Sequence, residues 1–244
     1  MSSPFERQAH AVKDLPSRRA KGLKIERLLK LHELSRPLRV LDVGTGNGGI
    51  AQYFGFHEAL QCDVTSVDVN DQRRLLDGYC FMQLPGTDLP FEDGSFDVVL
   101  SNHVIEHVGP AENQRAHVRE LARVLAPGGV GYLAVPNRWM IVEPHFRLPF
   151  LSWLPRRMRS PYVRFMNKGA YYDCEPLTVP ELDCLLGGVG LKFNHLHVEA
   201  IRETVAIEGG SLLARSVAKL PDSVLMGLRK ITPTLIYAFR HPAS

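Results

Sequence analysis

The chain has 244 residues, of which 45% are hydrophobic and 23% are charged, and its formal net charge at pH 7 is +3. This length and composition are typical of one α/β domain with a sizeable core, and so mild a charge neither requires nor excludes nucleic-acid binding. No run of eighteen apolar residues, which would predict a membrane-spanning helix, occurs. The four cysteines are far apart in the sequence and form no Cys-x-x-Cys pair, so we expect reduced thiols in a cytoplasmic compartment. Cys62 and Cys80 are expected at core positions of the sheet, and no metal site is expected.

The N-terminal region predicts an arm followed by a helix. Residues 1 to about 16 are expected to form an arm without signal-peptide character, because residues 1–21 are polar and charged. Over residues 17–34, leucines recur near helical spacing among Arg, Lys and Glu, which predicts an amphipathic helix that packs on a sheet or closes over a ligand. We therefore divide the chain into residues 1–36, the arm and helix, and residues 37–244, the main domain.

The stretch VLDVGTGNGGIAQYF, residues 40–54, predicts a short buried strand, a glycine turn and then a helix that begins at Ile50. Glycines permit positive φ and let a ligand approach the backbone, and the helix N-terminus beyond them supplies free N–H groups. The glycines of this turn are Gly44, Gly46, Gly48 and Gly49.

Two classes of ligand use such a turn. The spacing Gly44-x-Gly46-x-x-Gly49, with Asp68 about twenty residues on, also fits the dinucleotide fingerprint. Asp68 stands near the end of a second predicted strand, residues 62–69, where a carboxylate can accept both ribose hydroxyls of an adenosine. The turn alone therefore leaves NAD and S-adenosylmethionine open.

Strand and helix patterns alternate after this turn, which implies right-handed crossovers and a parallel sheet. The expected elements are strand 79–84, strand 96–100, helix 112–125 and strand 130–135. The fourth strand is apolar apart from Asp97, as in strands buried on both faces. Asn102 and His103 stand just past its carboxyl end, where ligands of open α/β sheets bind.

The segment from residue 136 to about 176 departs from this repeat. Between residues 144 and 172 it holds no Asp or Glu, while six Arg or Lys residues are interleaved with aromatic ones. Three interpretations are open: a segment that contacts anionic lipid, an RNA-binding surface, or a cap that packs its aromatic residues inward. The run LPFLSWLP favours lipid, because its two prolines suit an internal helix poorly.

Regular patterns resume with a helix over 179–186, a strand over 191–198 and a final strand over 234–239. The fold class that follows is a Rossmann-like, seven-stranded, mostly parallel sheet with helices on both faces, in which the two last strands pair. Inserts are expected at about 138–176, as a cap after strand five, and at about 200–231.

Four motifs together resemble the class I S-adenosylmethionine-dependent methyltransferases, and among them the type 11 (UbiE/UbiG-like) group. They are VLDVGTGNG (40–48), VDVN (67–70), GTDLPFEDGSFDVVLSNHVIEHV (86–108) and LARVLAPGGVGYLAVPN (121–137). The resemblance implies S-adenosylmethionine as the cofactor, since a dinucleotide fold has no comparable need for the acid-Leu-Pro-Phe turn at Asp88.

The resemblance also implies the donor-binding positions. These are Asp42, Gly44, Gly46 and Gly48 for the methionine moiety, Asp68 and Val69 for the ribose, Asp88 and Leu89 for the adenine, and Asn102 and His103 beside the reacting methyl.

Methyl transfer is an in-line displacement in which positioning and desolvation supply most of the catalysis. A hydroxyl acceptor also needs a base, usually histidine, and the candidates are His103, His107 and His145. Each has a plainer interpretation. His103 would pack against the cofactor, His107 would cap or pack a helix that contains residues 105–107, and His145 would lie in a segment that covers the acceptor. The absence of NPPY after the fourth strand argues against methylation of adenine or glutamine amino groups.

We therefore expect a cytoplasmic methyltransferase with a peripheral membrane contact through about 146–165. Its acceptor would be a hydroxyl on a small or lipid-linked molecule, such as a quinone precursor, a polyprenyl-linked or cell-envelope sugar, or a secondary metabolite. Nucleic acid is not expected as a partner, and the oligomeric state is not predicted. Two alternatives stay open: a tRNA or rRNA methyltransferase, and a non-catalytic adenosyl-binding scaffold subunit.

Overall fold

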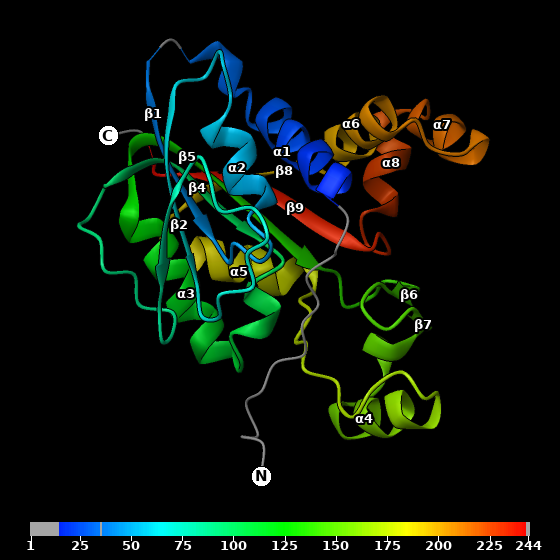
Figure 1. The fold of residues 1–244 in the computed structure, drawn as a ribbon. Coiled ribbons are helices and arrows are strands. Elements are labelled where there is room, and N and C mark those ends of the chain that lie inside the picture. Colours follow the sequence, from blue (N-terminus) through cyan, green and yellow to red (C-terminus); the bar gives the residue numbers. More distant parts are fainter. Residues whose placement is uncertain (1–14, 35, 243–244) are drawn as a thin grey trace.

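The computed structural model describes residues 15–34 and 36–242, which build a seven-stranded sheet in the order β3-β2-β1-β4-β5-β9-β8 (Figure 1). The arm expected over residues 1 to about 16 lies almost wholly outside the described residues. Strands β1 to β5 are parallel, and β9 runs antiparallel to both β5 and β8. The strands are β1 (Leu38–Val43), β2 (Cys62–Asp68), β3 (Cys80–Gln83), β4 (Phe96–Asn102), β5 (Leu125–Pro136), β8 (Lys192–His195) and β9 (Thr234–Arg240).

Helices cover both faces of this sheet, so its central strands are apolar on each side. Leu38 and Val40 of β1 join one hydrophobic core with α1, α2 and α6, whereas Leu41 and Val43 join the other with α3 and α5. The alternation follows from the two-residue period of a strand. The helices are α1 (Leu15–Leu29), α2 (Gly49–Gly55), α3 (Ala111–Val124), α5 (Val179–Gly188) and α6 (His197–Glu208). The seven-stranded, mostly parallel sheet and its flanking helices confirm the expected fold class.

Three expected details were wrong. The strand predicted over 191–198 ends at His195, and α6 begins two residues later, because Leu196 and Ala200 pack with helical spacing in the core shared with α1. The second insert, expected at about 200–231, contains most of α6 and two short helices, α7 (Leu212–Ala218) and α8 (Asp222–Leu228), and its bounds stay a prediction. Cys80 is exposed rather than in the core, since β3 is an edge strand, and Cys62 is only half-buried.

The insert after β5 forms a small unit of its own. It contains a hairpin of β6 (Val142–Glu143) and β7 (Leu148–Pro149), a 3₁₀ turn at Leu151–Trp153 and helix α4 (Arg156–Phe165). Its small apolar core consists of Phe146, Leu148, Leu151 and Val163. The unit projects from the sheet near the end of β5, and Asn137 and Leu177 form a bridge at its base (Figure 1). The division of the chain at residue 36 stays a prediction.

No helix in the part of the chain that the structure describes is both long and apolar enough to span a membrane.

The edge of the sheet opposite the carboxyl ends is fixed by a buried carboxylate, Asp97 at the start of β4. Its two oxygens accept hydrogen bonds from the side chain of Arg36 and from the side chain and backbone N–H of Arg39, at 3.0 to 3.1 Å. Burial of Asp97 raises its pKa, but these hydrogen bonds outweigh burial and hold the pKa at about 2, below the ordinary 3.8. The ionised carboxylate therefore stabilises the junction of β1 and β4.

We predict that Asp97→Asn lowers the free energy of unfolding by about 2 kcal/mol at pH 7, since a pKa lowered by nearly two units contributes about 1.4 kcal/mol per unit. A carboxylate whose pKa is lower in the folded than in the unfolded state stabilises the folded state at pH values above its unfolded-state pKa. The difference between wild type and variant should therefore persist above about pH 4 and disappear as the pH falls toward 2. Urea unfolding over this pH range measures it.

Asp71→Asn is the matched control. Arg73 holds the pKa of Asp71 at about 2 as well, but this pair lies at the surface, where ion pairs contribute little to stability. Equal stability of Asp97→Asn and wild type at pH 7 would contradict the assignment.

Candidate active site

The strand order reverses between β1 and β4, and ligands of open α/β sheets bind in the crevice at such a point. A cavity of about 690 Å³ lies there. Its walls come from the ends of β1 and β2 and from the segments after β3 and β4, and include Gly44, Asp68, Val69, Thr87, Leu89, Val104, His107 and Asp173. The cavity therefore collects residues from both halves of the sheet.

The turn after β1 presents its backbone to this crevice. Gly44 and Gly46 have φ values of +78° and +56°, which L side chains rarely adopt. A Cβ at Gly44 would lie 2.2 Å from a methyl of Val104, whereas a Cβ at Gly46 would meet nothing within 4 Å. The N–H of Gly46 donates to Asp68 Oδ2 at 2.9 Å, so the turn is tied to the end of β2.

Asp42 lies beneath the turn with 2% of its surface exposed, and its Oδ2 is buried without a hydrogen-bond partner among the described residues. Burial and, to a smaller extent, the charge of Asp68 raise the pKa of Asp42 to about 7, although Arg18 opposes this shift. A buried acceptor without a donor is costly, and an ammonium group would satisfy it.

Arg18 of α1 lies over the same turn, and the sequence interpretation missed it. Its Cβ would be 2.5 Å from a Cβ at Gly49, and its Nε is buried without a hydrogen-bond partner among the described residues. Burial lowers the pKa of Arg18, and the charge of Asp42 counteracts this. Arg18 and Asp42 together could bind a zwitterion, with the guanidinium beside its carboxylate and Asp42 beside its ammonium.

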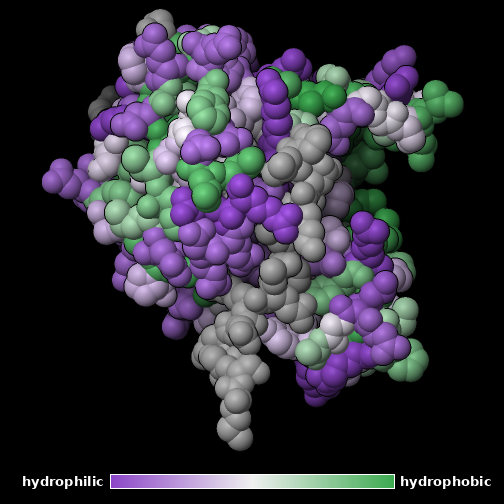
Figure 2. All heavy atoms as spheres, in the orientation of Figure 1, coloured by the Kyte–Doolittle hydropathy of each residue, from purple (hydrophilic) through white to green (hydrophobic). Residues whose placement is uncertain are grey.

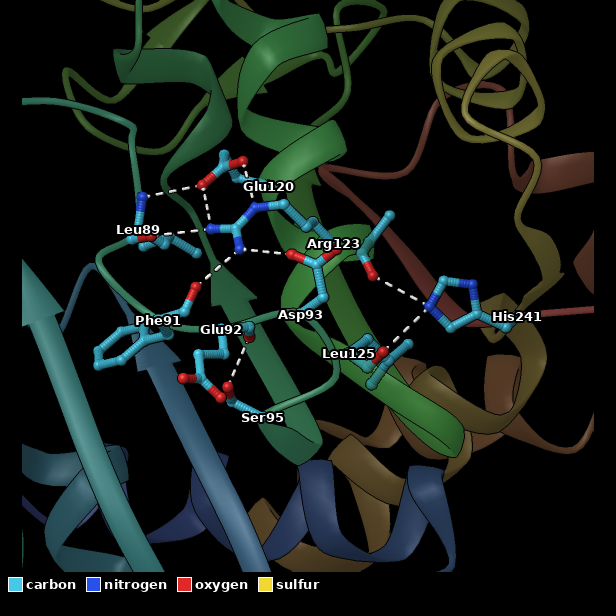
Figure 3. Close-up of polar contacts among 10 residues, drawn as sticks. Leu89, Phe91, Glu92, Asp93, Ser95, Glu120, Arg123, Leu125 and His241 are labelled. Atoms are coloured by element: carbon cyan, nitrogen blue, oxygen red, sulfur yellow. Dashed lines mark hydrogen bonds and ion pairs between the residues drawn. The ribbon is translucent and has the colours of Figure 1, made fainter.

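The loop after β3 is fixed by Arg123 of α3 (Figure 3). The guanidinium donates to the carbonyl oxygens of Leu89 and Phe91 at 2.8 and 2.7 Å, and it pairs with Asp93 and Glu120. Glu120 also accepts a hydrogen bond from the Leu89 N–H at 2.9 Å. Both backbone groups of Leu89 thus have partners within the protein, so its contact with adenine stays a prediction, as does that of the exposed Asp88.

A group of histidines and acids lies where β4 ends. His103 has φ +60°, an uncommon backbone state for a non-glycine residue, and its Nδ1 is 3.2 Å from Oε1 of the buried Glu106. Burial lowers the pKa of His103, although Glu106 opposes this. Asn102, expected just past β4, is instead the last, buried residue of that strand.

The insert adds His145 to this group. His145 Nδ1 is 2.6 Å from Oε1 of Glu143, which is fully buried. Burial lowers the pKa of His145, but the hydrogen bond with Glu143 outweighs this, so the pKa is raised. The rings of His103 and His107 lie 6.5 and 5.7 Å from the ring of His145, centre to centre. The three candidate histidines are therefore neighbours, although His107 lies in a separate 3₁₀ turn (Ile105–His107) rather than in a helix.

The sequence interpretation missed Arg18, Glu106, Arg123 and Glu143. The role of each residue depends on its burial or on contacts with residues distant in the sequence, and no local sequence motif marks either. The one signal was the Glu-Pro-His run at residues 143–145, which places a carboxylate two residues before an imidazole.

Comparison with known proteins agrees with the geometry. Residues 41–133 match a family model described as a methyltransferase domain of type 11. The chain is 34% identical over 179 residues to the malonyl-[acyl-carrier protein] O-methyltransferase of Enterobacter lignolyticus, which covers 65% of this chain and 66% of the relative. It is 40% identical over 97 residues to the "Probable phthiotriol/phenolphthiotriol dimycocerosates methyltransferase 2" of Mycobacterium ulcerans, which covers 37% of this chain and 36% of the relative.

The chain spans 27–40% of the length of five curated relatives, which include both N- and O-methyltransferases. Among solved structures, an S-adenosylmethionine-dependent methyltransferase from Mesorhizobium loti has a TM-score of 0.54 at 16% identity, over 84% of this chain and 91% of that one. Likeness at this identity shows the fold alone.

The residues present fit S-adenosylmethionine. Asp42 offers a buried acceptor atom without a hydrogen-bond partner among the described residues, which suits the ammonium group of the donor. Gly46 leaves open space on its Cβ side. Asp68 accepts hydrogen bonds from two backbone N–H groups and keeps further lone pairs for the ribose hydroxyls.

We predict that the affinity for S-adenosylmethionine rises with pH up to about 7. We expect the ammonium to bind the ionised form of Asp42, whose pKa without ligand is about 7, so each pH unit below that value should lower the affinity by up to tenfold. Above about pH 8 the α-amino group itself loses its proton and the affinity falls again. Calorimetric titration across this range measures the profile.

The Asp42→Asn variant should bind S-adenosylmethionine weakly, and its affinity should not rise between about pH 6 and 7. Asp63→Asn changes an exposed carboxylate near the opposite end of β2 and should keep the wild-type profile. The same rise in Asp42→Asn as in wild type would exclude Asp42 as the titrating group.

Proposed function

The chain belongs to the class I S-adenosylmethionine-dependent methyltransferases of the type 11 group, and we propose that it transfers a methyl group from S-adenosylmethionine to a hydroxyl of a small or lipid-linked acceptor. The donor supplies an activated sulfonium methyl. The protein's contribution is then to bind the donor, to align the acceptor and to exclude water.

The observation that carries the proposal is the position of the histidine and carboxylate group beside the donor cradle. His107 lines the same cavity as Gly44 and Asp68. His103 follows β4 directly, two strands from Asp68, and His145 reaches this place from the insert. A donor held by Asp42 and Asp68 would therefore have imidazoles on the side from which an acceptor enters.

His103 is the best candidate for the base that takes the acceptor proton. Glu106 orients its imidazole through the 3.2 Å contact with Nδ1, as a carboxylate orients histidine in other general-base pairs. The positive φ of His103 supports a functional role, since strained backbone is retained mostly where geometry serves a site.

An apolar acceptor is supported by a second cavity, of about 480 Å³, between α6, α7 and the start of β9. Its lining is mostly apolar and includes Ile201, Val205, Leu213 and Ile236. Thr234, one of its lining residues, pairs with Pro136, the last residue of β5, so part of this cavity lies toward the carboxyl ends of the parallel strands. Two relatives are named for acceptors carried on a lipid or an acyl carrier.

A membrane contact through about 146–165 is part of the proposal. Phe146 and Leu151 face the insert's own core, whereas Phe150 and Phe165 are 50% and 82% exposed. Arg159 is buried against backbone carbonyls, so the cations left at the surface for lipid headgroups include Arg147, Arg157, Arg164 and Lys168. Figure 2 shows this mixture of hydrophobic and hydrophilic residues over the insert, and exposed apolar residues at the tip of α7.

The first test of the function is transfer of label from radiolabelled S-adenosylmethionine into a cell extract, which is then separated into lipid, RNA, protein and small polar fractions. We expect label in the lipid or small polar fraction, attached through a methyl ether. Asp68→Ala should abolish transfer, because the ribose loses both of its charge-assisted hydrogen bonds.

Label in RNA would instead support a tRNA or rRNA methyltransferase. No label in any fraction, from a protein that binds the donor, would support a non-catalytic adenosyl-binding subunit.

The membrane contact predicts that the double variant Phe150→Ser/Phe165→Ser loses affinity for vesicles containing anionic phosphatidylglycerol by at least about tenfold. Withdrawing even one phenylalanine from an apolar environment costs about 1.5–3 kcal/mol. Sedimentation with vesicles measures binding, and donor affinity should stay unchanged.

Phe56→Ser is the matched control, since Phe56 is 61% exposed and follows α2 rather than lying in the insert. Equal sedimentation of wild type and the double variant would refute the membrane contact.

A further inference from the structure

Three side chains with metal-binding atoms meet where the insert touches the sheet. His107 comes from the turn after β4, His145 from the loop of the β6–β7 hairpin, and Cys174 from the segment that leads back to α5. One nitrogen of each imidazole and the sulfur all lie within 4.8 Å of one another. Cys174 is 67 and 29 residues from the two histidines, so no sequence motif announces the group.

The spacing of these atoms is close to that of a tetrahedral ion site. The sulfur of Cys174 lies 3.9 Å from Nδ1 of His107 and 3.9 Å from Nδ1 of His145. An ion with bonds of about 2.3 Å to sulfur and 2.0–2.1 Å to nitrogen would separate these ligands by about 3.6 Å. The two sulfur-to-nitrogen distances therefore exceed those of such a site by about 0.3 Å.

The surroundings carry the charge that a cation requires. Glu106 and Glu143 are fully buried, and Oε2 of Glu106 has no hydrogen-bond partner among the described residues. Asp173 Oδ1 lies 3.7 Å from the sulfur of Cys174. Two fully buried carboxylates are expensive to bury without compensating positive charge, of which Lys21 supplies a part through its charge interaction with Glu106.

Glu143 stands where the outer partner of a metal site stands, because its Oε1 is 2.6 Å from Nδ1 of His145. Glu106 Oε1 is 3.9 Å from Nε2 of His107, so it acts on this ring through its charge and not through a hydrogen bond. A metal-ligating histidine commonly gives one ring N–H to a carboxylate and presents the other nitrogen to the ion. At His145 this requires the ring to keep one nitrogen on Glu143 and turn the other toward the sulfur.

We propose that His107, His145 and Cys174 bind a divalent cation of the zinc class at the junction of the insert and the sheet. A thiolate and two imidazoles select such ions over magnesium or calcium, which prefer oxygen. Three protein ligands leave a fourth position for water or another group. The ion fastens the beginning and the end of the insert to the turn after β4, and His103 is left as the base. This goes beyond the proposed function and does not depend on it.

The first experiment measures the metal content of the full chain, purified without a histidine tag and dialysed against metal-free buffer. Elemental analysis should find about one zinc per chain, and Cys174→Ala should reduce this at least tenfold. Cys184→Ala and His32→Ala, which change an exposed cysteine and an exposed histidine elsewhere, should keep the wild-type content.

A second experiment covers the case in which Cys174→Ala folds poorly, and it uses the wild-type chain. After removal of bound metal, Co²⁺ should produce the visible bands of a tetrahedral ion and a sulfur-to-cobalt charge-transfer band, and Zn²⁺ should displace both. Glu143→Gln should weaken the metal affinity by about 10- to 100-fold, the usual cost of losing an outer carboxylate.

A wild-type chain that is purified without metal and gives no thiolate band with Co²⁺ would overturn the proposal. The cluster would then be a hydrogen-bonded network only. Methyl transfer is not a readout in either experiment, so a failure here leaves the proposed function standing, and the reverse also holds.

Discussion

The site depends on one constraint: a carboxylate, Asp42, is buried near the end of the central strand. A carboxylate in that position is costly unless a cation or a set of donors compensates it. The protein provides only part of this compensation, through the field of Arg18, and the pKa of Asp42 stays near 7. The free protein therefore carries a buried, incompletely compensated carboxylate, which the ammonium group of a ligand would compensate.

The neighbouring elements keep that carboxylate accessible without exposing it. The glycine turn crosses above it and is tied to β2 through the hydrogen bond between Gly46 and Asp68. Val104 occupies the space where a Cβ at Gly44 would lie, so the turn and the start of the next segment fit only with glycine there. Arg123 fixes the loop after β3 from the other side (Figure 3). The three supports come from different crossovers, so the site combines segments that follow strands β1 to β4.

The parts of the structure that sequence predicted are those with local causes. The strand before the glycine turn, the acid at the end of β2 and the buried fourth strand are each specified by periodicity or by turn residues within about ten positions. The predicted end of the strand over 191–198 was wrong because two sequence patterns overlap there. The alternation over 191–198 fits a strand, but the apolar residues at 196 and 200 have the spacing of a helix, and the structure forms α6 from His197. The side chains that build the histidine and carboxylate group were missed for another reason. Glu106 and Glu143 acquire their meaning from burial and from partners that only the tertiary fold brings near.

The two halves of the site follow different rules. The donor side is set by the strand order of the sheet, whose crevice exists in any chain with this topology. The proposed acceptor side lies at the insert, which has only a small apolar core of Phe146, Leu148, Leu151 and Val163. Polar contacts join the insert to the sheet at several points. The N–H of Glu175 donates to the carbonyl of Glu106 at 2.8 Å, the N–H of Arg138 donates to the carbonyl of Leu177 at 3.0 Å, and the side chains of His107, His145 and Cys174 meet. If this junction sets the distance between acceptor and donor, substrate choice in this chain depends on the residues that join the insert to β4 as much as on those that touch the acceptor.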